Sequence, residues 1–372
     1  MRTLSRIYIV CLLFLAIGCQ KEQKENKKDS SFQSNVHYAK GFDIVDDQGV
    51  KKLIIHKPYQ NPERSLEYIL STKTNLKDHE IKVPVERIVV SSTSHIPMLE
   101  LLHKEASLVG FPNTKFISSK KTRKLIDEGK ITEIGQEQNI NTESLLELTP
   151  DLVVGFALSG NDKVYSGIEK LGVPMIYNGD WLEETPLGRA EWIKFFGVLL
   201  GKEKEADSIF RHIESEYLNA KKIASTSKKQ PTVLAGSMYR DVWYVPAGES
   251  FKAAFFKDAN LNYLWSETEG TGSLSLSFES ILEKGINADY WIGCGLFTSK
   301  KDMLSANKNY DKFTSFNNGK IFNSSLKTGE TGGMIYFELS PVRPDLVLKD
   351  MIKITNPDLL PNYTLTFFDP VQ

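Results

Sequence analysis

The sequence predicts an α/β protein made of two lobes that are joined by a single long α-helix. Short apolar strands alternate with helical segments in two separate parts of the chain, and one uninterrupted helical stripe lies between those parts. A similar helix–strand unit also occurs once in each part. Alternating strands and helices are typical of a parallel sheet that helices cover on both faces. The 372 residues suffice for two such lobes, each with its own core.

The overall composition is that of a soluble globular protein. Hydrophobic residues make up 41% of the chain and charged residues 25%, and the formal net charge is -1. A chain so close to neutral has no general electrostatic attraction for a polyanion. We therefore expect no nucleic-acid partner.

Residues 1–19 have the features of a lipoprotein signal peptide. Arg2 and Arg6 precede an apolar run over residues 7–17, which is short for a membrane span but typical of the hydrophobic region of a signal peptide. The run ends in Ala16-Ile17-Gly18-Cys19, which resembles the lipobox of bacterial lipoproteins. That resemblance implies cleavage before Cys19, lipidation of its sulfur, and an exported protein anchored to a membrane in the periplasm or cell envelope. An ordinary signal peptide with a chance cysteine is the alternative.

Residues 20–35 are expected to form a flexible tether, because this polar stretch cannot bury enough apolar surface to offset the entropy of ordering it. A β-rich extension is predicted over residues 36–82. Its two clearest strands are residues 41–45 and 52–56, with a turn at residues 47–49.

The N-terminal α/β lobe is predicted over residues 83–201 and the C-terminal α/β lobe over residues 225–372. In the first lobe, strands are expected at residues 87–91, 107–110, 151–156 and 173–177, with helices at 96–103, 142–148 and 164–171. In the second, strands are expected at residues 232–237, 242–245, 290–292 and 320–322, with helices at 251–256, 278–284 and 344–354.

The bridging helix is predicted over residues 202–224. Apolar residues recur there in steps of three and four from Ala206 to Ala220, after Gly201 ends the preceding helical stripe. Such a helix would be about 30 Å long, roughly the width of a small domain.

One internal similarity favours pseudo-symmetry between the lobes. The helix that starts at Glu143 in "ESLLE" precedes the strand "DLVV", and the helix that starts at Glu279 in "ESILE" precedes the strand "DYWI". Chance similarity of five helix-forming residues is common, but the two units stand at equivalent points of the two lobes.

An ordered series of segments resembles a known family. The segments "ERIVV", "ESLLELTPDLVVG", "LGVPMIY", "LGRAEWIKFFGVLLGKEKEA", "ESILEKGINADYWIG" and "SPVRPDLVLKDMIKITNP" follow one another from about residue 83 to residue 357. This order is similar to that of the ABC-importer periplasmic binding proteins for ferric siderophores and cobalamin. The resemblance implies two Rossmann-like lobes linked by one rigid helix (class III), with a small-molecule metal chelate bound in the cleft between them and only small lobe motion on binding.

The resemblance also implies a docking partner, the ABC permease dimer of the inner membrane. In the family, one surface glutamate on each lobe contacts arginines of that permease, and the matching residues here are Glu143 and Glu279. Two carboxylates on one face would fix the orientation of the complex. Each glutamate could equally serve only to stabilise the start of its helix through the helix dipole.

Candidate ligand residues follow from the rule that ligands bind at the carboxyl ends of strands in doubly wound sheets. The rule points to residues 92–95, 238–240, 296–297 and 328–333 and to Trp181. Aromatic rings offer large contact areas, and arginine pairs with anionic oxygens of a chelate. The residues chosen as candidates are Ser94, His95, Trp181, Tyr239, Arg240, Trp243, Trp265 and Arg343. Core packing is the alternative for Trp243 and Trp265, and a salt bridge at a helix start is the alternative for Arg343.

Two other classes of function fit the sequence less well. A zinc or manganese binder needs ligands from both lobes, whereas the histidines (His37, His56, His79, His95, His103 and His212) all precede the second lobe. An enzyme is disfavoured because the common catalytic and nucleotide-binding motifs are absent; the glycine-rich residues 329–333 lack the lysine of a phosphate loop. We expect no catalysis and no cofactor apart from the cargo. The sequence leaves open whether the cargo is a hydroxamate, catecholate or citrate-like chelate, cobalamin or haem.

Overall fold

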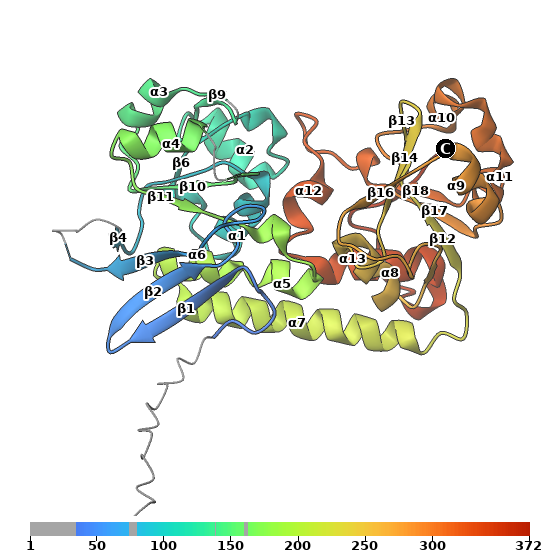
Figure 1. The fold of residues 1–372 in the computed structure, drawn as a ribbon, viewed down its shortest axis with the longest axis horizontal. Helices are drawn as coiled ribbons and strands as arrows, with labels where there is room; N and C mark the ends of the chain where they lie inside the picture. Colours follow the sequence, from blue (N-terminus) through green and yellow to red (C-terminus); the bar gives the residue numbers. More distant parts are fainter. Residues whose placement is uncertain (1–34, 74–79, 138, 160–162) are drawn as a thin grey trace, which may run out of the picture. The chain divides into compact units, whose positions relative to one another are not determined.

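The computed structural model describes residues 35–73, 80–137, 139–159 and 163–372 (Figure 1). The predicted signal peptide, Cys19 and nearly all of the predicted tether lie outside these residues. Within the described part of the chain, no helix has both the length and the apolar character needed to cross a membrane.

The chain first forms a four-stranded sheet. Its strands are β1 (Phe42–Asp47), β2 (Val50–Ile55), β3 (Leu66–Ser71) and β4 (Glu80–Lys82), with β1, β2 and β3 antiparallel and β4 parallel to β3. The first two are the predicted strands, and Gln48 and Gly49 turn between them with positive φ angles of 55° and 84°. The sheet packs on the lobe that follows, since the Phe42 ring lies 4.5 Å from that of Trp192.

A parallel five-stranded sheet forms the centre of the N-terminal lobe. Its strands are β5 (Ile88–Val90), β6 (Leu108–Phe111), β7 (Thr132–Glu133), β10 (Leu152–Gly155) and β11 (Met175–Tyr177), in the order β11-β10-β5-β6-β7. Val90 and Val154 face one buried apolar cluster, whereas Val89 and Val153 face another. Both faces of the sheet are therefore covered, as the alternation of strands and helices predicts.

The helices of this lobe are α1 (Ile96–Leu101), α2 (Lys120–Asp127), α3 (Thr142–Glu147), α4 (Lys163–Lys170), α5 (Pro186–Ala190) and α6 (Ile193–Leu199). Short 3-10 turns stand at Thr93–His95 (η1) and Asp180–Leu182 (η4), and a small hairpin pairs β8 (Gly135–Gln136) with β9 (Asn139–Ile140).

The C-terminal lobe has a second five-stranded sheet. Its strands are β12 (Thr232–Ala235), β15 (Asn262–Tyr263), β17 (Tyr290–Ile292), β18 (Ile321–Asn323) and β19 (Asp369–Pro370), in the order β15-β12-β17-β18-β19, with only β19 antiparallel to its neighbour. The helices are α8 (Phe251–Asp258), α9 (Phe278–Gly285), α10 (Lys300–Ala306), α11 (Thr314–Asn317), α12 (Ile335–Leu339) and α13 (Pro344–Thr355).

The strand expected over residues 232–237 ends early, at Ala235. Gly236 has a φ of +81°, and a Cβ atom there would lie 1.9 Å from the carbonyl oxygen of Tyr244. Beyond Gly236 the chain enters a separate antiparallel sheet of β13 (Ser237–Tyr239), β14 (Val242–Pro246) and β16 (Ser273–Leu276). The glycine therefore redirects the chain out of the central sheet.

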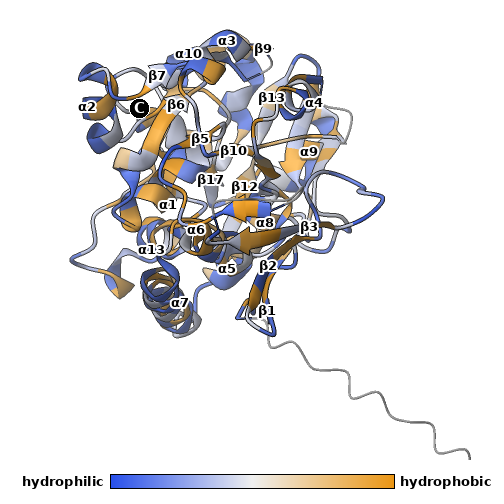
Figure 2. Ribbon diagram, turned by 90° about the vertical axis from the view of Figure 1, so that its left-hand side faces the viewer, coloured by the Kyte–Doolittle hydropathy of each residue, from blue (hydrophilic) through white to orange (hydrophobic). Residues whose placement is uncertain are grey.

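The predicted long helix is α7 (Glu203–Ser225), which runs beneath both lobes in Figure 1. Its buried residues divide into two groups: Ala206, Phe210 and Ile213 belong to the N-terminal core, whereas Tyr217, Ala220 and Ala224 belong to the C-terminal core. One helix about 35 Å long thus serves both cores in turn. Figure 2 shows that hydropathy follows burial: the buried strand β6 is orange (hydrophobic), whereas α7 is mostly blue (hydrophilic).

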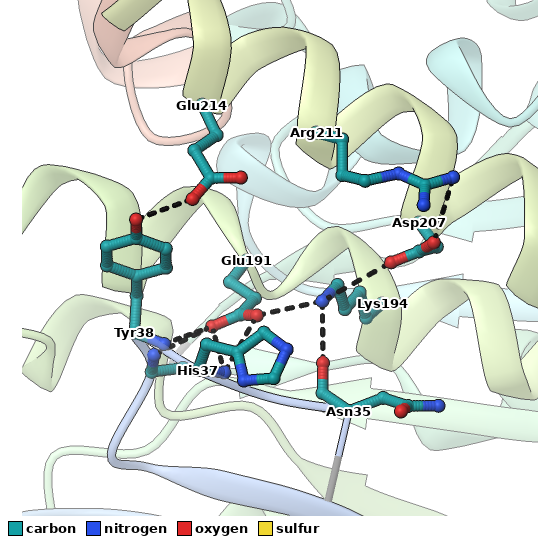
Figure 3. A network of polar contacts seen from close by, with 9 residues as sticks. Asn35, His37, Tyr38, Glu191, Lys194, Asp207, Arg211 and Glu214 are labelled. Atoms are coloured by element: carbon teal, nitrogen blue, oxygen red, sulfur yellow. Dashed lines mark hydrogen bonds and ion pairs between the residues drawn. The ribbon is translucent and has the colours of Figure 1, made fainter. Parts of the chain in front are cut away.

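Two buried carboxylates hold the start of the described chain against the N-terminal lobe, and Figure 3 shows the contacts of the first, Glu191. Glu191 accepts backbone hydrogen bonds from His37, Tyr38 and Ala39 at 2.6–3.0 Å, and Lys194 Nζ contacts both Glu191 and the Asn35 carbonyl. Further along, Glu183 accepts from the backbone N–H groups of residues 40 and 41. We call residues 35–41 with Glu183 and Glu191 the N-terminal clamp.

Candidate functional site

Each central sheet has a position where the chain connections diverge to opposite sides. In the N-terminal lobe this switch point lies between β5 and β10, and in the C-terminal lobe it lies between β12 and β17. Ligands of doubly wound sheets bind beyond the carboxyl ends of such strands. A ligand is therefore expected near the segments that follow β5, β6, β10, β12 and β17.

The loop after β5 lies at the N-terminal switch point. Ser91 Oγ accepts hydrogen bonds from the Phe156 N–H at 3.0 Å and from the Tyr165 hydroxyl at 2.8 Å, so it fixes the loop after β10 next to its own. Ser92 caps η1 by accepting from the Ser94 N–H. These hydrogen bonds fix the positions of the loops that follow β5 and β10.

Ser94 and His95, both predicted to contact the ligand, point into the lobe. Ser94 Oγ donates to Asp180 Oδ2 at 3.1 Å and is mostly buried. His95 is fully buried, with its ring 5.3 Å from that of Phe196. Burial lowers the pKa of His95, although Asp180 and Asn178 beside it act in the opposite direction. Neither side chain offers surface for a ligand, so the structure gives both a structural position instead.

Trp181 lies in η4 and is half-buried, with its ring 5.4 Å from that of Phe156. Its carbonyl oxygen accepts a hydrogen bond from Arg189 Nη2 at 2.8 Å. Arg189, which the sequence analysis does not single out, places its guanidinium 3.8 Å from the ring of Phe251 in the other lobe. Trp181 Nε1 and Arg189 Nε are buried, and within the described residues neither has a hydrogen-bond partner.

Tyr239 and Arg240 lie on the β13–β14 hairpin rather than in the loop that the sequence predicts. Tyr239 is the last residue of β13, and Arg240 follows it with a φ of 55°. The guanidinium of Arg240 stands 5.4 Å from the Tyr239 ring, and both side chains are exposed. The structure therefore keeps both residues available on the surface of the C-terminal lobe.

Trp243 and Trp265 belong to the C-terminal core, which corrects their place among the ligand candidates. Trp243 is fully buried, stacks on Trp291 at 5.2 Å and donates from Nε1 to the Ala235 carbonyl at 3.1 Å. Trp265 is nearly as buried and packs near Tyr263. Packing, the alternative reading of both residues, accounts for these positions.

Arg343 forms a salt bridge with Asp345 in place of the predicted ligand contact. Its guanidinium donates two hydrogen bonds to the buried Asp345 carboxylate, at 2.9 and 2.8 Å, at the start of α13. Asp345 raises the pKa of Arg343 through these bonds. The arginine thus forms the helix-start salt bridge that stood as its alternative role.

Several large apolar side chains are exposed in both lobes. They include Phe116 after β6, Leu158 after β10, Tyr239 at the end of β13, Leu296 after β17 and Phe337 on α12, with exposed fractions of 51%, 61%, 65%, 76% and 57%. Isolated exposed apolar residues are ordinary, but Phe116 and Phe337 come from different lobes and line the same cavity. Only Tyr239 and Leu296 were among the positions that the sequence predicts.

The cavity that Phe116 and Phe337 line has a volume of about 300 Å³. Ser92 and Thr93, which follow β5, and Met334 of the C-terminal lobe also line it. Its lining is mostly apolar with a few polar groups, which is typical of small-molecule sites. Among the described residues, no group of three or more His, Cys, Asp or Glu side chains is arranged to hold a metal ion.

Glu143 and Glu279 occupy matching positions in the two lobes. Each is exposed in the first turn of its helix, α3 or α9, two residues after the N-cap residue, Asn141 or Ser277. Within the described residues, neither carboxylate forms a salt bridge. Both glutamates are therefore accessible to a partner.

Two doubly wound lobes joined by one long helix define the fold of the helix-linked bilobal class of binding proteins. Residues 88–325 match the model of the periplasmic binding protein family, and the chain belongs to that family. An uncharacterized lipoprotein of Methanocaldococcus jannaschii is 26% identical over 99% of this chain and 96% of its own length.

Solved structures show the same fold. A possible iron-binding (periplasmic solute-binding) protein of Staphylococcus epidermidis has a TM-score of 0.58 and 20% identity, covering 73% of this chain and 99% of its own. The periplasmic heme-binding protein RhuT of Roseiflexus sp. RS-1 has a TM-score of 0.55 and 18% identity, covering 72% of this chain and 99% of its own. These likenesses confirm the predicted class III fold.

Proposed function

We propose that this protein is the exported, lipid-anchored binding component of an ABC importer and that it carries a metal chelate such as a ferric siderophore, haem or cobalamin. The observation that carries the proposal is the cavity of about 300 Å³ that Phe116 of the N-terminal lobe and Phe337 of the C-terminal lobe line together, beyond the carboxyl ends of β5 and β6. Such a cavity suits an organic chelate, whose outer face is largely carbon, better than a bare ion. The iron- and heme-binding names of the structural neighbours agree with this chemistry.

The exposed guanidinium of Arg240 offers hydrogen-bond donors that suit the acceptor oxygen atoms of a chelate. Within the described residues, no lysine or arginine lines the cavity of about 300 Å³, which favours a ligand with modest negative charge over a highly anionic catecholate complex.

A tryptophan-fluorescence titration tests the cargo. Purified protein is titrated with haemin, cyanocobalamin, ferric citrate and representative hydroxamate and catecholate complexes. One of these should bind with one-to-one stoichiometry and be recovered chemically unchanged. Turnover of the bound compound, or saturable binding of free zinc or manganese with no chelate binding, would contradict the proposal.

Tyr239→Ala should weaken binding of the titrated chelate by about tenfold or more, because it removes a large exposed ring from the proposed binding surface. Trp181→Ala is expected to act in the same direction. Leu146→Ala, at an exposed apolar residue on α3, is the control. Equal affinities in all four proteins would remove Tyr239 and Trp181 from the site.

Docking to a permease through Glu143 and Glu279 is tested by the double variant Glu143→Lys/Glu279→Lys. Reversing both charges should reduce uptake while chelate affinity stays at the wild-type value. Glu147→Lys/Glu283→Lys is the matched control, since both residues are exposed and lie on the same two helices. Normal uptake with the first double variant would end the docking idea.

Lipid anchorage at Cys19 is tested by Cys19→Ser, which should release the protein into the soluble fraction. The lipobox-like Ala16-Ile17-Gly18-Cys19 motivates this proposal, and the name of the archaeal relative supports it. Cys294, which is buried, provides the control substitution Cys294→Ser with retention unchanged. Membrane retention of the Cys19 variant would argue for another form of attachment.

A further inference from the structure

The glycine-rich segment of the sequence forms a closed loop that belongs to the C-terminal lobe. We call residues 327–335 the strap; it connects β18 and the 3-10 turn after it to α12. Thr328 and Met334 form an antiparallel bridge, the Gly329 N–H donates to the Gly333 carbonyl at 2.8 Å, and the Ile335 N–H donates to the Lys327 carbonyl at 3.1 Å. These bonds give the strap a defined shape of its own.

The strap docks on the N-terminal lobe. Thr331 Oγ1 donates to the Lys115 carbonyl at 2.7 Å. A Cβ atom on Gly333 would lie 2.1 Å from the Phe116 carbonyl oxygen, and one on Gly329 would lie 2.6 Å from Ser118 Cα. Glycine is needed at both positions because the two backbones meet there without room for a side chain.

Glu338, on α12 directly after the strap, strengthens this contact. Its carboxylate accepts hydrogen bonds from the Ser118 N–H at 2.6 Å and the Ser119 N–H at 2.9 Å, and only 3% of the residue is exposed. Ser119 is the N-cap of α2, so the carboxylate also faces the positive end of that helix. The two lobes are thus joined at the strap as well as through α7.

The strap and α12 separate two cavities. The cavity of about 300 Å³ has Gly332, Met334 and Phe337 in its wall. A second cavity of about 510 Å³ has Thr328, Gly329, Glu330 and Glu338 in its wall, together with Glu100 and Ser119 of the N-terminal lobe. The same short segment therefore lines both spaces.

We propose that the strap is a specificity-determining wall: docked on the N-terminal lobe, it confines the ligand to the smaller cavity and excludes chelates that need both spaces. This inference rests on the proposed function of the cleft. A volume of about 300 Å³ is at the lower end of the range for small-molecule sites, so moving the wall changes which ligands fit. The strap is the element of the cleft whose displacement would join the two cavities.

Hydrogen exchange of the ligand-free protein tests the docked state. The Ser118 and Ser119 amides have Glu338 as their acceptor, so Glu338→Ala should speed their exchange at least tenfold. Glu338→Gln, which keeps one acceptor oxygen, should give an intermediate rate. Glu330→Ala is the control, because Glu330 is exposed and lies in the same strap. Unchanged exchange in Glu338→Ala would overturn the docked strap.

Binding selectivity tests the wall itself, with ferrioxamine B, haemin and cyanocobalamin as probes. Gly333→Val should push the strap away from Phe116 and raise the affinity for cyanocobalamin, relative to the smallest probe that binds, at least tenfold. Glu338→Ala should act in the same direction if Gly333→Val fails to fold. An unchanged ratio with normal wild-type binding contradicts this inference alone. Absence of binding to every probe, by wild type and variants, contradicts both this inference and the proposed function.

Discussion

Glu338 is a carboxyl group held almost entirely out of water between two lobes. Burial raises its pKa to about 7, and nearby Glu100 adds to the increase, while the hydrogen bonds from Ser118 and Ser119 act against it. The folded protein therefore binds this proton more tightly than the unfolded chain does. Its contribution to stability is complete below about pH 4.5 and is lost as the pH rises through about 7.

Glu338→Gln should remove that pH dependence. The rise of the Glu338 pKa from 4.5 to about 7 corresponds to a change in the free energy of unfolding of at most about 3 kcal/mol between pH 4.5 and pH 8. The measurement is urea unfolding of both proteins across this range, with the difference between them plotted against pH, so that contributions of other titrating groups such as Asp350 cancel. A difference that does not vary with pH would show that Glu338 titrates normally.

Trp243 offers a contrasting test, because its indole is confined to the C-terminal core. Trp243→Phe removes the bond to the Ala235 carbonyl and part of the packing against Trp291 and Phe313, so unfolding should become easier by about 2–3 kcal/mol. Chelate affinity of the folded variant should equal that of wild type. A large loss of affinity without loss of stability would return Trp243 to the ligand site.

The sequence contained part of the information on these residues. In β14 the burial alternates, with Trp243 and Val245 inside and Tyr244 outside, and this period of two places Trp243 on the core face. Nothing comparable marks Arg189, whose importance comes from contact with Phe251, a residue distant in the sequence. Ser94 and His95 follow a strand at the switch point, but only coordinates show that their side chains turn inward.

At the scale of single elements, the N-terminal clamp joins residues 35–41 to the lobe through two carboxylates that accept backbone N–H groups; Glu191 also contacts Lys194, and Glu183 also accepts a hydrogen bond from Trp192 Nε1. Glu191 is fully buried and Lys194 nearly so. Glu191→Ala removes the acceptor of three backbone N–H groups and leaves the lysine with only the Asn35 carbonyl and the more distant Asp207 among the described residues, so it should lower the free energy of unfolding by about 3–5 kcal/mol.

Differential scanning calorimetry and limited proteolysis within residues 35–41 measure this effect. The control is Glu184→Ala, whose carboxylate forms longer and more exposed salt bridges to Lys40 and Lys57, and which should cost less than about 1 kcal/mol. Equal behaviour of the two variants would mean that the clamp adds little to the fold.

Elements with a strong apolar pattern were predictable, and those defined by tertiary contact were not. The strands of the parallel sheets are runs such as "IVV" and "LVVG", buried on both faces. By contrast, β4 has three residues and gains its strand geometry from pairing with β3. Strand β13 depends on Gly236, whose close approach to Tyr244 is a contact between segments rather than a local signal.

For the whole molecule, the alternating pattern and the single long helix were enough to predict two lobes and their connection. The strap's contact with the N-terminal lobe was not predictable, because Glu338 and Ser118 are 220 residues apart. The glycines of residues 329–333 were visible in the sequence, yet their role follows only from the backbone that they meet. Local patterns thus determine the lobes, and long-range contacts determine how the space between them is divided.

Helix α7 packs against both cores in turn, so its straightness should affect the distance between the two lobes. Its contact with the N-terminal core ends at Ile213 and its contact with the C-terminal core begins at Tyr217, and the exposed Ser215 lies between them. Proline at position 215 removes a helical hydrogen bond and clashes with the preceding turn, at a cost of about 3 kcal/mol, and it should bend the helix where it passes from one lobe to the other.

Because a bend there changes the distance between the lobes without altering either core, Ser215→Pro should change the radius of gyration in X-ray scattering and weaken chelate binding about tenfold. Ser215→Ala is the control and should preserve both quantities, since alanine favours the helix. If the proline variant keeps wild-type scattering and affinity, the strap and the other inter-lobe contacts are sufficient to hold the lobes apart, and the rigidity of the helix is not what fixes the cleft.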